Sequence, residues 1–249
     1  MDGKRTLYGR RRGRPLRAQR QQQVDRWLPR LSIDLADMPA DPAALFSRPV
    51  RDVWLEVGFG GGEHLFHQAL QHPEIGFIGC EPFLNGIGRL IALIDNGAAP
   101  PDNIRILTDD ARALIAQLPA GSIGRVFVLF PDPWPKRRHH RRRFIAPAQL
   151  DALARIMRPG AELRIATDHI DYLRWILFHC LGHRAFRWQV QGPDDWRSRP
   201  ADWPPTRYED KARARGAFCA YLRFVRQPEN PAEAPENGNK NLVEPAKSA

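Results

Sequence analysis

The chain has few cysteines and no long apolar run. Its three cysteines, Cys80, Cys180 and Cys219, lie far apart and form no C-x-x-C pair. This spacing predicts neither a disulfide framework nor a zinc cage, and it favours a reducing compartment. The longest apolar stretches have the length of a β-strand, so we expect no membrane span. The first residues lack the apolar segment of a secretory signal, and we therefore expect a cytoplasmic protein.

Acidic residues are outnumbered by basic ones. Lys and Arg total 38 against 28 Asp and Glu, which gives a formal charge of +10 at pH 7. This excess favours a polyanionic partner, because each phosphate that is neutralised releases condensed counterions. Much of the charge lies in residues 1–20, where the one acid is Asp2 and the bases are Lys4, Arg5, Arg10, Arg11, Arg12, Arg14, Arg17 and Arg20.

Composition divides the chain into three parts. With 249 residues, 43% of them hydrophobic, the chain can bury one substantial core. We expect a basic, partly disordered N-terminal arm and lead-in over residues 1–45, because like charges repel. One domain should follow over residues 46–226. Residues 227–249 hold four prolines and no aromatic residue, which predicts a disordered acidic tail.

Short apolar runs alternate with helical patterns. Five runs are each followed by a helix candidate, at residues 53–57, 77–81, 104–107, 125–130 and 163–167. This alternation is typical of an α/β fold with a mainly parallel sheet and helices on both faces. Two late strands, at residues 186–190 and 218–225, flank a loop rich in Pro and Trp without a clear crossover helix. The sequence therefore predicts seven strands, with an antiparallel strand at one edge.

The first predicted strand ends in an acid and a glycine cluster. Glu56 is followed by Gly58, Gly60 and Gly62. Ligands of open α/β sheets bind beyond the carboxyl ends of the strands, and glycine lets the backbone approach them closely. A dinucleotide fingerprint G-x-G-x-x-G would need a small residue at position 63, where Glu63 stands instead. The pattern therefore disfavours NAD.

Acids also end the next three predicted strands. Glu81 is placed to accept hydrogen bonds from a ribose diol, and Asp109 or Asp110 can meet an adenine amino group. Asp132 follows the fourth strand. Carboxylates in these places suit a sulfonium cation and would repel a phosphate ligand. The alternative for Asp109 or Asp110 is a helix N-cap.

Asp132 stands between two prolines and beside Trp134, just before a basic run at residues 136–143. Proline fixes its own φ and restricts the residue before it, so this loop should be stiff. The arrangement favours a pocket for a flat polar group next to a polyanion, and hence a nucleic-acid active site. A solvated surface loop is the alternative. We expect His139 and His140 to face phosphates rather than a metal.

The E-x-G-x-G-x-G spacing of residues 56–62 resembles the first motif of Rossmann-like S-adenosylmethionine methyltransferases. With P-D-P-W-x-K at 131–136, A-T-D at 166–168 and T-R-Y-E at 206–209, the chain is similar over residues 50–226 to the tRNA (guanine-N7)-methyltransferase family. The resemblance implies a Rossmann-like class I methyltransferase fold. It also implies methyl transfer from S-adenosylmethionine to N7 of a guanine in tRNA, in the variable loop. One departure is Pro135, where a histidine is common in relatives.

The resemblance also implies the site residues. The S-adenosyl-L-methionine site would consist of Glu56, Gly58, Gly60, Glu81, Asp110 and Asp132, with Asp132 as the catalytic residue. The target guanosine would be contacted by Lys136, Asp168, Thr206, Arg207, Tyr208 and Glu209. We expect no metal. We expect a monomer or a weak homodimer, and the need for an accessory subunit stays open.

The proposed chemistry agrees with these residue types. Guanine N7 has a lone pair and no proton, so its methylation needs no general base. The purine becomes positive as the methyl group transfers, and a nearby carboxylate stabilises that charge. We assign this role to Asp132. Two alternatives stay open: an exocyclic-amine methyltransferase, because residues 131–134 loosely resemble its N/D-P-P-Y/F/W motif, and a non-catalytic RNA-binding protein on the same scaffold.

Overall fold

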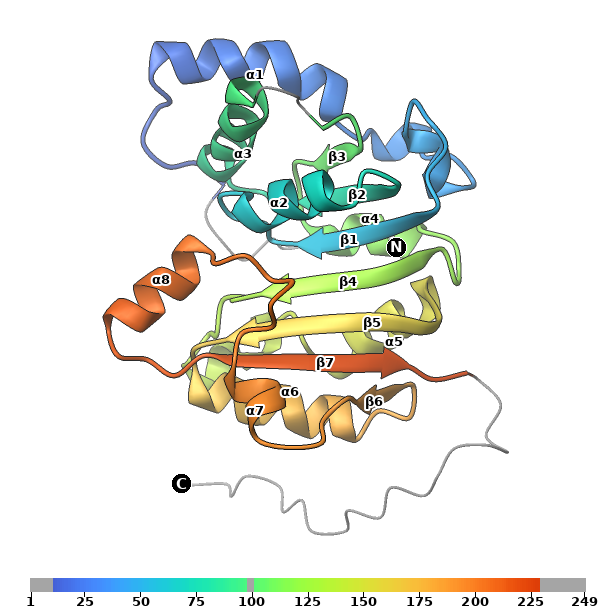
Figure 1. Cartoon of the computed structure of the whole chain (residues 1–249), viewed down its shortest axis with the longest axis vertical. Helices are drawn as coiled ribbons and strands as arrows, with labels where there is room; N and C mark the ends of the chain where they lie inside the picture. Colours follow the sequence, from blue (N-terminus) through green and yellow to red (C-terminus); the bar gives the residue numbers. More distant parts are fainter. Residues whose placement is uncertain (1–10, 98–100, 229–249) are drawn as a thin grey trace.

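A single sheet of seven strands forms the centre of the molecule (Figure 1). The computed structural model describes residues 11–97 and 101–228. Its strands follow the order β3-β2-β1-β4-β5-β7-β6 across the sheet. Their bounds are β1 Asp52–Val57, β2 Ile75–Cys80, β3 Ile104–Leu107, β4 Ile123–Leu129, β5 Met157–Thr167, β6 Phe186–Trp188 and β7 Ala220–Arg226.

The sheet is mainly parallel, as the sequence predicts. The five strands β3, β2, β1, β4 and β5 pair in parallel, while β7 runs antiparallel to both β5 and β6. The antiparallel strand is thus next to the edge, and the short β6 is the edge strand itself. The parallel strands all end at one side of the sheet, where Thr167 at the end of β5 lies opposite Ala220 at the start of β7.

Helices cover both faces of the sheet. Alternate residues of β1 point to opposite faces: Val53 and Leu55 join the core cluster under α4, α5 and α6, and Trp54 joins the cluster under α1, α2 and α3. The helix bounds are α1 Ala18–Leu31, α2 Glu63–Gln71, α3 Leu84–Asn96, α4 Ala111–Gln117, α5 Pro147–Ile156, α6 Ile170–Leu181, α7 Asp194–Arg197 and α8 Arg207–Ala214. No described helix is long and apolar enough to cross a membrane.

Three helices lie where the sequence predicts none. Helix α1 begins inside the expected arm and packs along α3, where Gln23 and Trp27 both donate hydrogen bonds to Asp95. Helices α7 and α8 interrupt the loop between the last two strands. Helix α5 ends at Ile156 and is followed directly by β5, which contains the Pro159-Gly160 pair. Most of the predicted tail, from residue 229 onward, lies outside the described residues.

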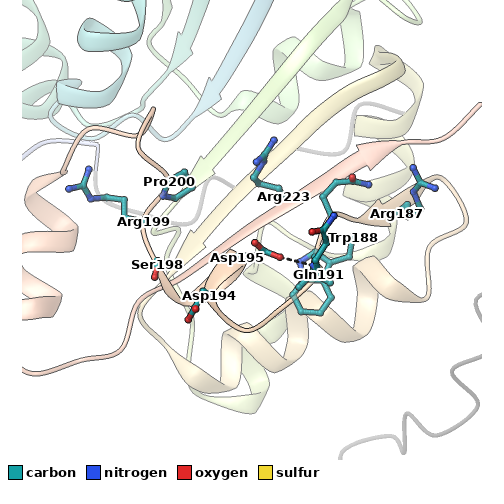
Figure 2. A pocket seen from close by; sticks show the side chains of 11 residues that line it. Arg187, Trp188, Gln191, Asp194, Asp195, Ser198, Arg199, Pro200 and Arg223 are labelled. Carbon is teal, nitrogen blue, oxygen red and sulfur yellow. Dashed lines mark hydrogen bonds between the residues drawn. The ribbon is translucent and has the colours of Figure 1, made fainter.

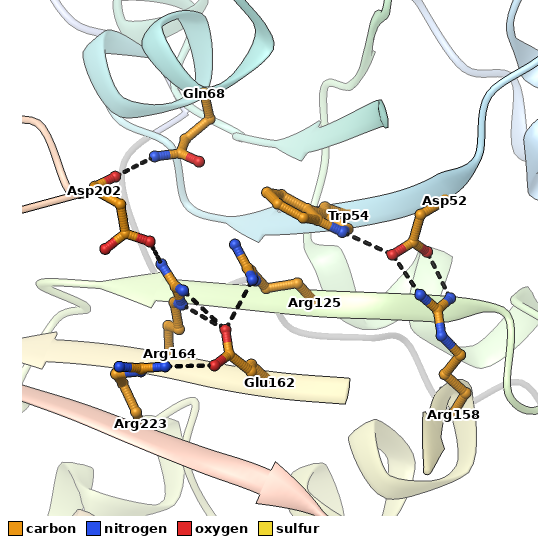
Figure 3. A network of polar contacts seen from close by, with 9 residues as sticks. All are labelled: Asp52, Trp54, Gln68, Arg125, Arg158, Glu162, Arg164, Asp202 and Arg223. Atoms are coloured by element: carbon orange, nitrogen blue, oxygen red, sulfur yellow. Dashed lines mark hydrogen bonds and ion pairs between the residues drawn. The ribbon is translucent and has the colours of Figure 1, made fainter. Parts of the chain in front are cut away.

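A polar network lies across β4, β5 and β7 on the face toward α2 (Figure 3). Glu162 of β5 forms ion pairs with Arg125, Arg164 and Arg223. Arg164 also reaches Asp202, at 2.6 Å from Nη1 to Oδ2. Because Asp202 belongs to the loop before α8, this network attaches that loop to the centre of the sheet.

Candidate active site

The acids that end β1, β2 and β4 lie close enough to influence one another. Burial raises the pKa of Glu81, and the negative charges of Asp132 and Glu56 raise it further. Hydrogen bonds from two backbone N–H groups oppose this shift. Because β1 pairs with both β2 and β4, the structure brings these three predicted site residues to neighbouring strand ends.

The glycine loop after β1 is bent by left-handed residues. Gly58, Gly60 and Gly62 have φ values of +69°, +58° and +78°, a region that favours glycine. Gly60 N donates to Glu81 Oε2 at 2.8 Å, and Phe83 N donates to Oε1 at 2.9 Å. A Cβ added at Gly58 would meet no atom within 4 Å. Glu81 is therefore fixed in direction, and open space lies beside the loop.

Glu56 has a partner that the sequence analysis missed. Nδ1 of His64, in the first turn of α2, lies 2.7 Å from Glu56 Oε2, and both side chains are buried. A carboxylate can only accept, so Nδ1 carries the proton. The sequence contains one indication of this pair, a polar residue at a position of the helix that faces the core.

Asp110 is the N-cap of α4. Its carboxylate accepts from Arg112 N at 2.9 Å and from Arg112 Nη1 at 2.8 Å. The capping alternative is therefore confirmed for Asp110, while a contact with adenine stays a prediction. Asp109 forms an ion pair at 3.0 Å with Arg11 of the N-terminal segment.

The loop that carries Asp132 has an unusual backbone. Phe130 and Trp134 have φ values of +50° and +44°, and such conformations cost energy in residues other than glycine. Phe130 N donates to Ala166 O at 2.8 Å, which ties the start of the loop to β5. The Asp132 side chain is exposed, yet the surrounding protein desolvates its carboxylate enough to raise its pKa.

The basic run after this loop is not one uniform surface. Its 3-10 helix η3 (Arg137–Arg142) is followed by Arg143, which is buried at 2% exposure. Arg143 Nε donates to Pro133 O at 2.8 Å, and its guanidinium lies over the rings of Tyr172 and Trp175. Arg143 therefore connects the Asp132 loop to α6. The exposed members of the run are Lys136, Arg137, Arg138 and Arg141.

The T-R-Y-E motif starts α8, which Figure 1 shows beyond the carboxyl ends of the parallel strands. Thr206 Oγ1 accepts from Glu209 N at 3.2 Å as the N-cap. Glu209 is 2% exposed, and its Oε1 contacts Arg199, Arg213 and the Tyr221 hydroxyl. Glu209 thus connects α8 to β7. A contact between Glu209 and guanine stays a prediction.

The other predicted substrate residues in α8 and after β5 have contacts of their own. Tyr208 is half-exposed and packs on the glycine loop, since a Cβ added at Gly60 would lie 2.7 Å from its Cε2. Burial and the negative charges of Glu81 and Asp132 raise the pKa of Tyr208. Arg207 Nε lies 4.0 Å from Glu63. Asp168, after β5, pairs with Arg215 at 3.0 Å.

A concavity lies close to Glu209, because one of its lining residues, Arg199, contacts that side chain. It has a volume of about 600 Å³ and lies between β6, β7 and α7. Figure 2 shows the side chains that line it. Its lining mixes charges of both signs, with Arg187 and Arg223 against Asp194 and Asp195. None of its lining residues belongs to the four motifs. The described residues also contain no group of three or more His, Cys, Asp or Glu side chains that could hold a metal ion.

Comparison with known proteins identifies the family. The family described as "Putative methyltransferase" matches residues 50–220. The tRNA (guanine-N(7)-)-methyltransferase of Rhodospirillum rubrum is 54% identical, over 89% of this chain and 88% of its own length. That of Azorhizobium caulinodans is 50% identical, over 88% and 94%. The chain belongs to the tRNA (guanine-N7)-methyltransferase family.

Solved structures agree with a methyltransferase fold for this family member. The 16S rRNA methyltransferase KamB has a TM-score of 0.52 at 19% identity, over 72% of this chain and 89% of its own. The W203A mutant of the 16S rRNA (adenine(1408)-N(1))-methyltransferase of Catenulisporales acidiphilia has a TM-score of 0.50 at 16% identity, over 80% and 94%. At such identities the likeness concerns the fold alone.

Proposed function

We propose that this chain transfers the methyl group of S-adenosylmethionine to N7 of a guanine in tRNA, in the variable loop. The supporting observation is that Glu56, Glu81 and Asp132 stand at the carboxyl ends of the neighbouring strands β1, β2 and β4, with open space beside Gly58 in the loop after β1. Membership of the tRNA (guanine-N7)-methyltransferase family specifies the reaction. We further propose residues 46–226 as the catalytic domain, with α1 packed onto it.

The residues present fit the cofactor. Glu81 accepts one backbone hydrogen bond on each oxygen, and each oxygen keeps lone pairs for a ribose hydroxyl. The space beside Gly58 lets a ligand approach the backbone. When bound, S-adenosylmethionine supplies an electrophilic methyl group on a sulfonium. The nearby carboxylates of Glu56, Glu81 and Asp132 favour that cation.

Asp132 is the residue that we propose to act in the chemical step. Its carboxylate is partly desolvated, and a charge in such surroundings acts more strongly on a developing positive charge than it would in water. The tether from Arg143 to Pro133 and the bond from Phe130 to Ala166 hold the loop in place. Placing guanine N7 in line with the methyl group accounts for much of the remaining rate acceleration.

Exposed cations lie in two segments of the chain, and we propose that they contact tRNA phosphates. The first segment is the exposed part of the basic run defined above. The second is the N-terminal segment, which docks on α3, where Gly13 N donates to Asn85 Oδ1 at 2.9 Å and Asn85 Nδ2 donates to Arg14 O at 2.8 Å. This segment presents Arg12, Arg14 and Arg17 to solvent. Guanine selection is assigned to Asp168 and the Thr206–Glu209 motif.

Labelled methyl transfer to bulk tRNA tests the proposal. N7-methylguanosine makes RNA cleavable by borohydride reduction and aniline, so cleavage should map to one position in the variable loop. An exocyclic-amine methyltransferase would transfer label without creating a cleavage site. A non-catalytic RNA-binding protein would transfer no label. Asp132→Asn serves as the control that keeps the shape of the site and removes the charge.

A further inference from the structure

The inner face of α2 carries two buried polar side chains one turn apart. His64 and Gln68 are each 2% exposed. His64 Nδ1 meets Glu56 at 2.7 Å, and Gln68 Nε2 donates to Asp202 O at 2.6 Å. The two side chains thus reach different parts of the molecule, the end of β1 and the loop before α8.

The surroundings of His64 fix its orientation. Its ring packs edge-on against Phe127 of β4, with centroids 4.6 Å apart. Nε2 is buried without a hydrogen-bond partner. Burying a polar atom without a hydrogen-bond partner costs free energy. The hydrogen bond between Nδ1 and Glu56 therefore has to offset the cost of burying Nε2. Glu56 needs such a donor, because its side chain is only 4% exposed and it lies within electrostatic reach of Glu81.

We propose that His64 is a positioning residue for the cofactor. By donating to Oε2 it fixes the direction of the Glu56 carboxylate and leaves Oε1 to accept from the cationic methionine part of S-adenosylmethionine. This inference rests on the proposed function. It assigns to His64, which lies outside all four motifs, a share of the cofactor affinity.

Side-chain geometry supplies a selective test. In asparagine the amide nitrogen occupies about the place of His Nδ1, whereas in glutamine it reaches about as far as Nε2. His64→Asn therefore keeps the donor to Glu56, while His64→Gln misplaces it and His64→Leu removes it. Gln68→Leu is the matched control, since Gln68 is equally buried in the same helix and contacts Asp202 instead.

Calorimetry with S-adenosylmethionine and S-adenosylhomocysteine measures the outcome, alongside thermal unfolding of every variant. We expect His64→Leu and His64→Gln to weaken both ligands about 10- to 100-fold, the range that corresponds to a lost hydrogen bond to a charged group. The affinities of His64→Asn should stay within about threefold of those of the original protein, because its amide places a neutral donor in nearly the same position. Gln68→Leu should lower thermal stability and leave both affinities unchanged.

A double mutant separates positioning from general stability. In a Glu56→Ala background, His64→Leu should weaken the ligands no further, because the carboxylate that His64 positions is already absent. Equal or tighter binding by His64→Leu would overturn the inference. If that variant does not fold, equal binding by the Asn and Gln variants overturns it. An unmodified protein that binds neither ligand would instead overturn the proposed function itself.

Discussion

Asp132 shows how a single side chain is prepared for its role. Two residues with positive φ, Phe130 and Trp134, flank it, and such backbone strain is kept only where surrounding contacts hold it. Those contacts include the Arg143 bond to Pro133 and the Phe130 bond to Ala166. The carboxylate is thus fixed in position while its surroundings keep part of its water away.

Removing the charge of Asp132 should affect turnover more than binding. We expect Asp132→Asn to lower the single-turnover rate at saturating substrates by about 100-fold or more, as for other groups that act on transition-state charge. Affinity for tRNA should change little, because the proposed phosphate contacts lie elsewhere. Rapid-quench methylation and filter binding measure the two quantities. A collapse of tRNA binding with a normal single-turnover rate would show that Asp132 binds substrate instead.

The raised pKa of Asp132 also predicts a pH-dependent stability. A carboxyl group with a higher pKa in the folded protein than in the unfolded chain stabilises the fold at low pH. That contribution is lost as the pH rises through the folded-state value. Asp132→Asn should therefore have the higher Tm near neutral pH, and the difference should vanish below about pH 4, the ordinary range of Asp. Thermal unfolding of both proteins from about pH 4 to about pH 8 tests this; a difference independent of pH would contradict it.

Glu81 should contribute to cofactor affinity both directly and through the glycine loop. Glu81→Ala removes the proposed ribose contact and the acceptor of Gly60 N. We expect it to weaken S-adenosylmethionine by about 1.5–3 kcal/mol, the scale of a hydrogen bond to a charged group. Calorimetry measures the change. Glu74→Ala is the control, since that carboxylate precedes β2 at the opposite edge of the sheet; equal affinity in folded Glu81→Ala would disprove the assignment.

At the scale of elements, η3 and Arg143 divide the basic run into two functions. The exposed arginines of η3 face solvent, whereas Arg143 connects the Asp132 loop to α6 through Tyr172 and Trp175. The first group suits phosphate binding, and the second is part of the folded core.

Substitution within the run should separate these functions. Arg143→Met leaves Pro133 O without its donor and removes the stacked guanidinium, so we expect a loss of about 1–3 kcal/mol in the free energy of unfolding. Arg138→Met, at an exposed position, should change that free energy by less than about 0.5 kcal/mol. Urea unfolding measures both. Equal stability of the two variants would mean that Arg143 does not support the loop.

At the scale of the whole molecule, exposed positive charge borders the edge where the parallel strands end. The docked N-terminal segment contacts Asp109 after β3 and Asn85 at the start of α3. The exposed part of the basic run follows β4. The arginines on the face of the sheet toward α2 are instead paired with acids, in the network around Glu162. We therefore expect a polyanion to be attracted to the edge of the sheet where the proposed site lies.

The salt dependence of tRNA binding tests this distribution. Replacing Arg137, Arg138 and Arg141 by Gln should flatten the plot of log affinity against log salt by about 0.7–0.9 for each phosphate that the variant no longer neutralises. The methylated position and the affinity for S-adenosylmethionine should not change. Arg187→Gln, in the edge strand β6, should leave the slope as it is. An unchanged slope in the triple variant would mean that these arginines are only solvated surface.

Features that depend on neighbouring residues could be predicted from the sequence. The alternation of apolar strands with helices, the glycine bends after β1 and the acids at strand ends are all local patterns, and in a parallel sheet such ends must meet at one edge. Even the cap formed by Asp110 was a local alternative. The predicted place of the site, at the carboxyl edge of the sheet, therefore rested on the order of residues along the chain.

The burial of polar side chains and the identity of their partners followed from tertiary packing alone. In the sequence Arg143 is one member of a basic run, but in the structure its guanidinium lies over the rings of Tyr172 and Trp175. Glu209 forms an ion pair with Arg199 and accepts a hydrogen bond from the Tyr221 hydroxyl. Such partners come from elements far apart in the chain, and burial depends on how those elements pack. Local pattern carries no information on that packing, which is why the folded protein alone reveals these contacts.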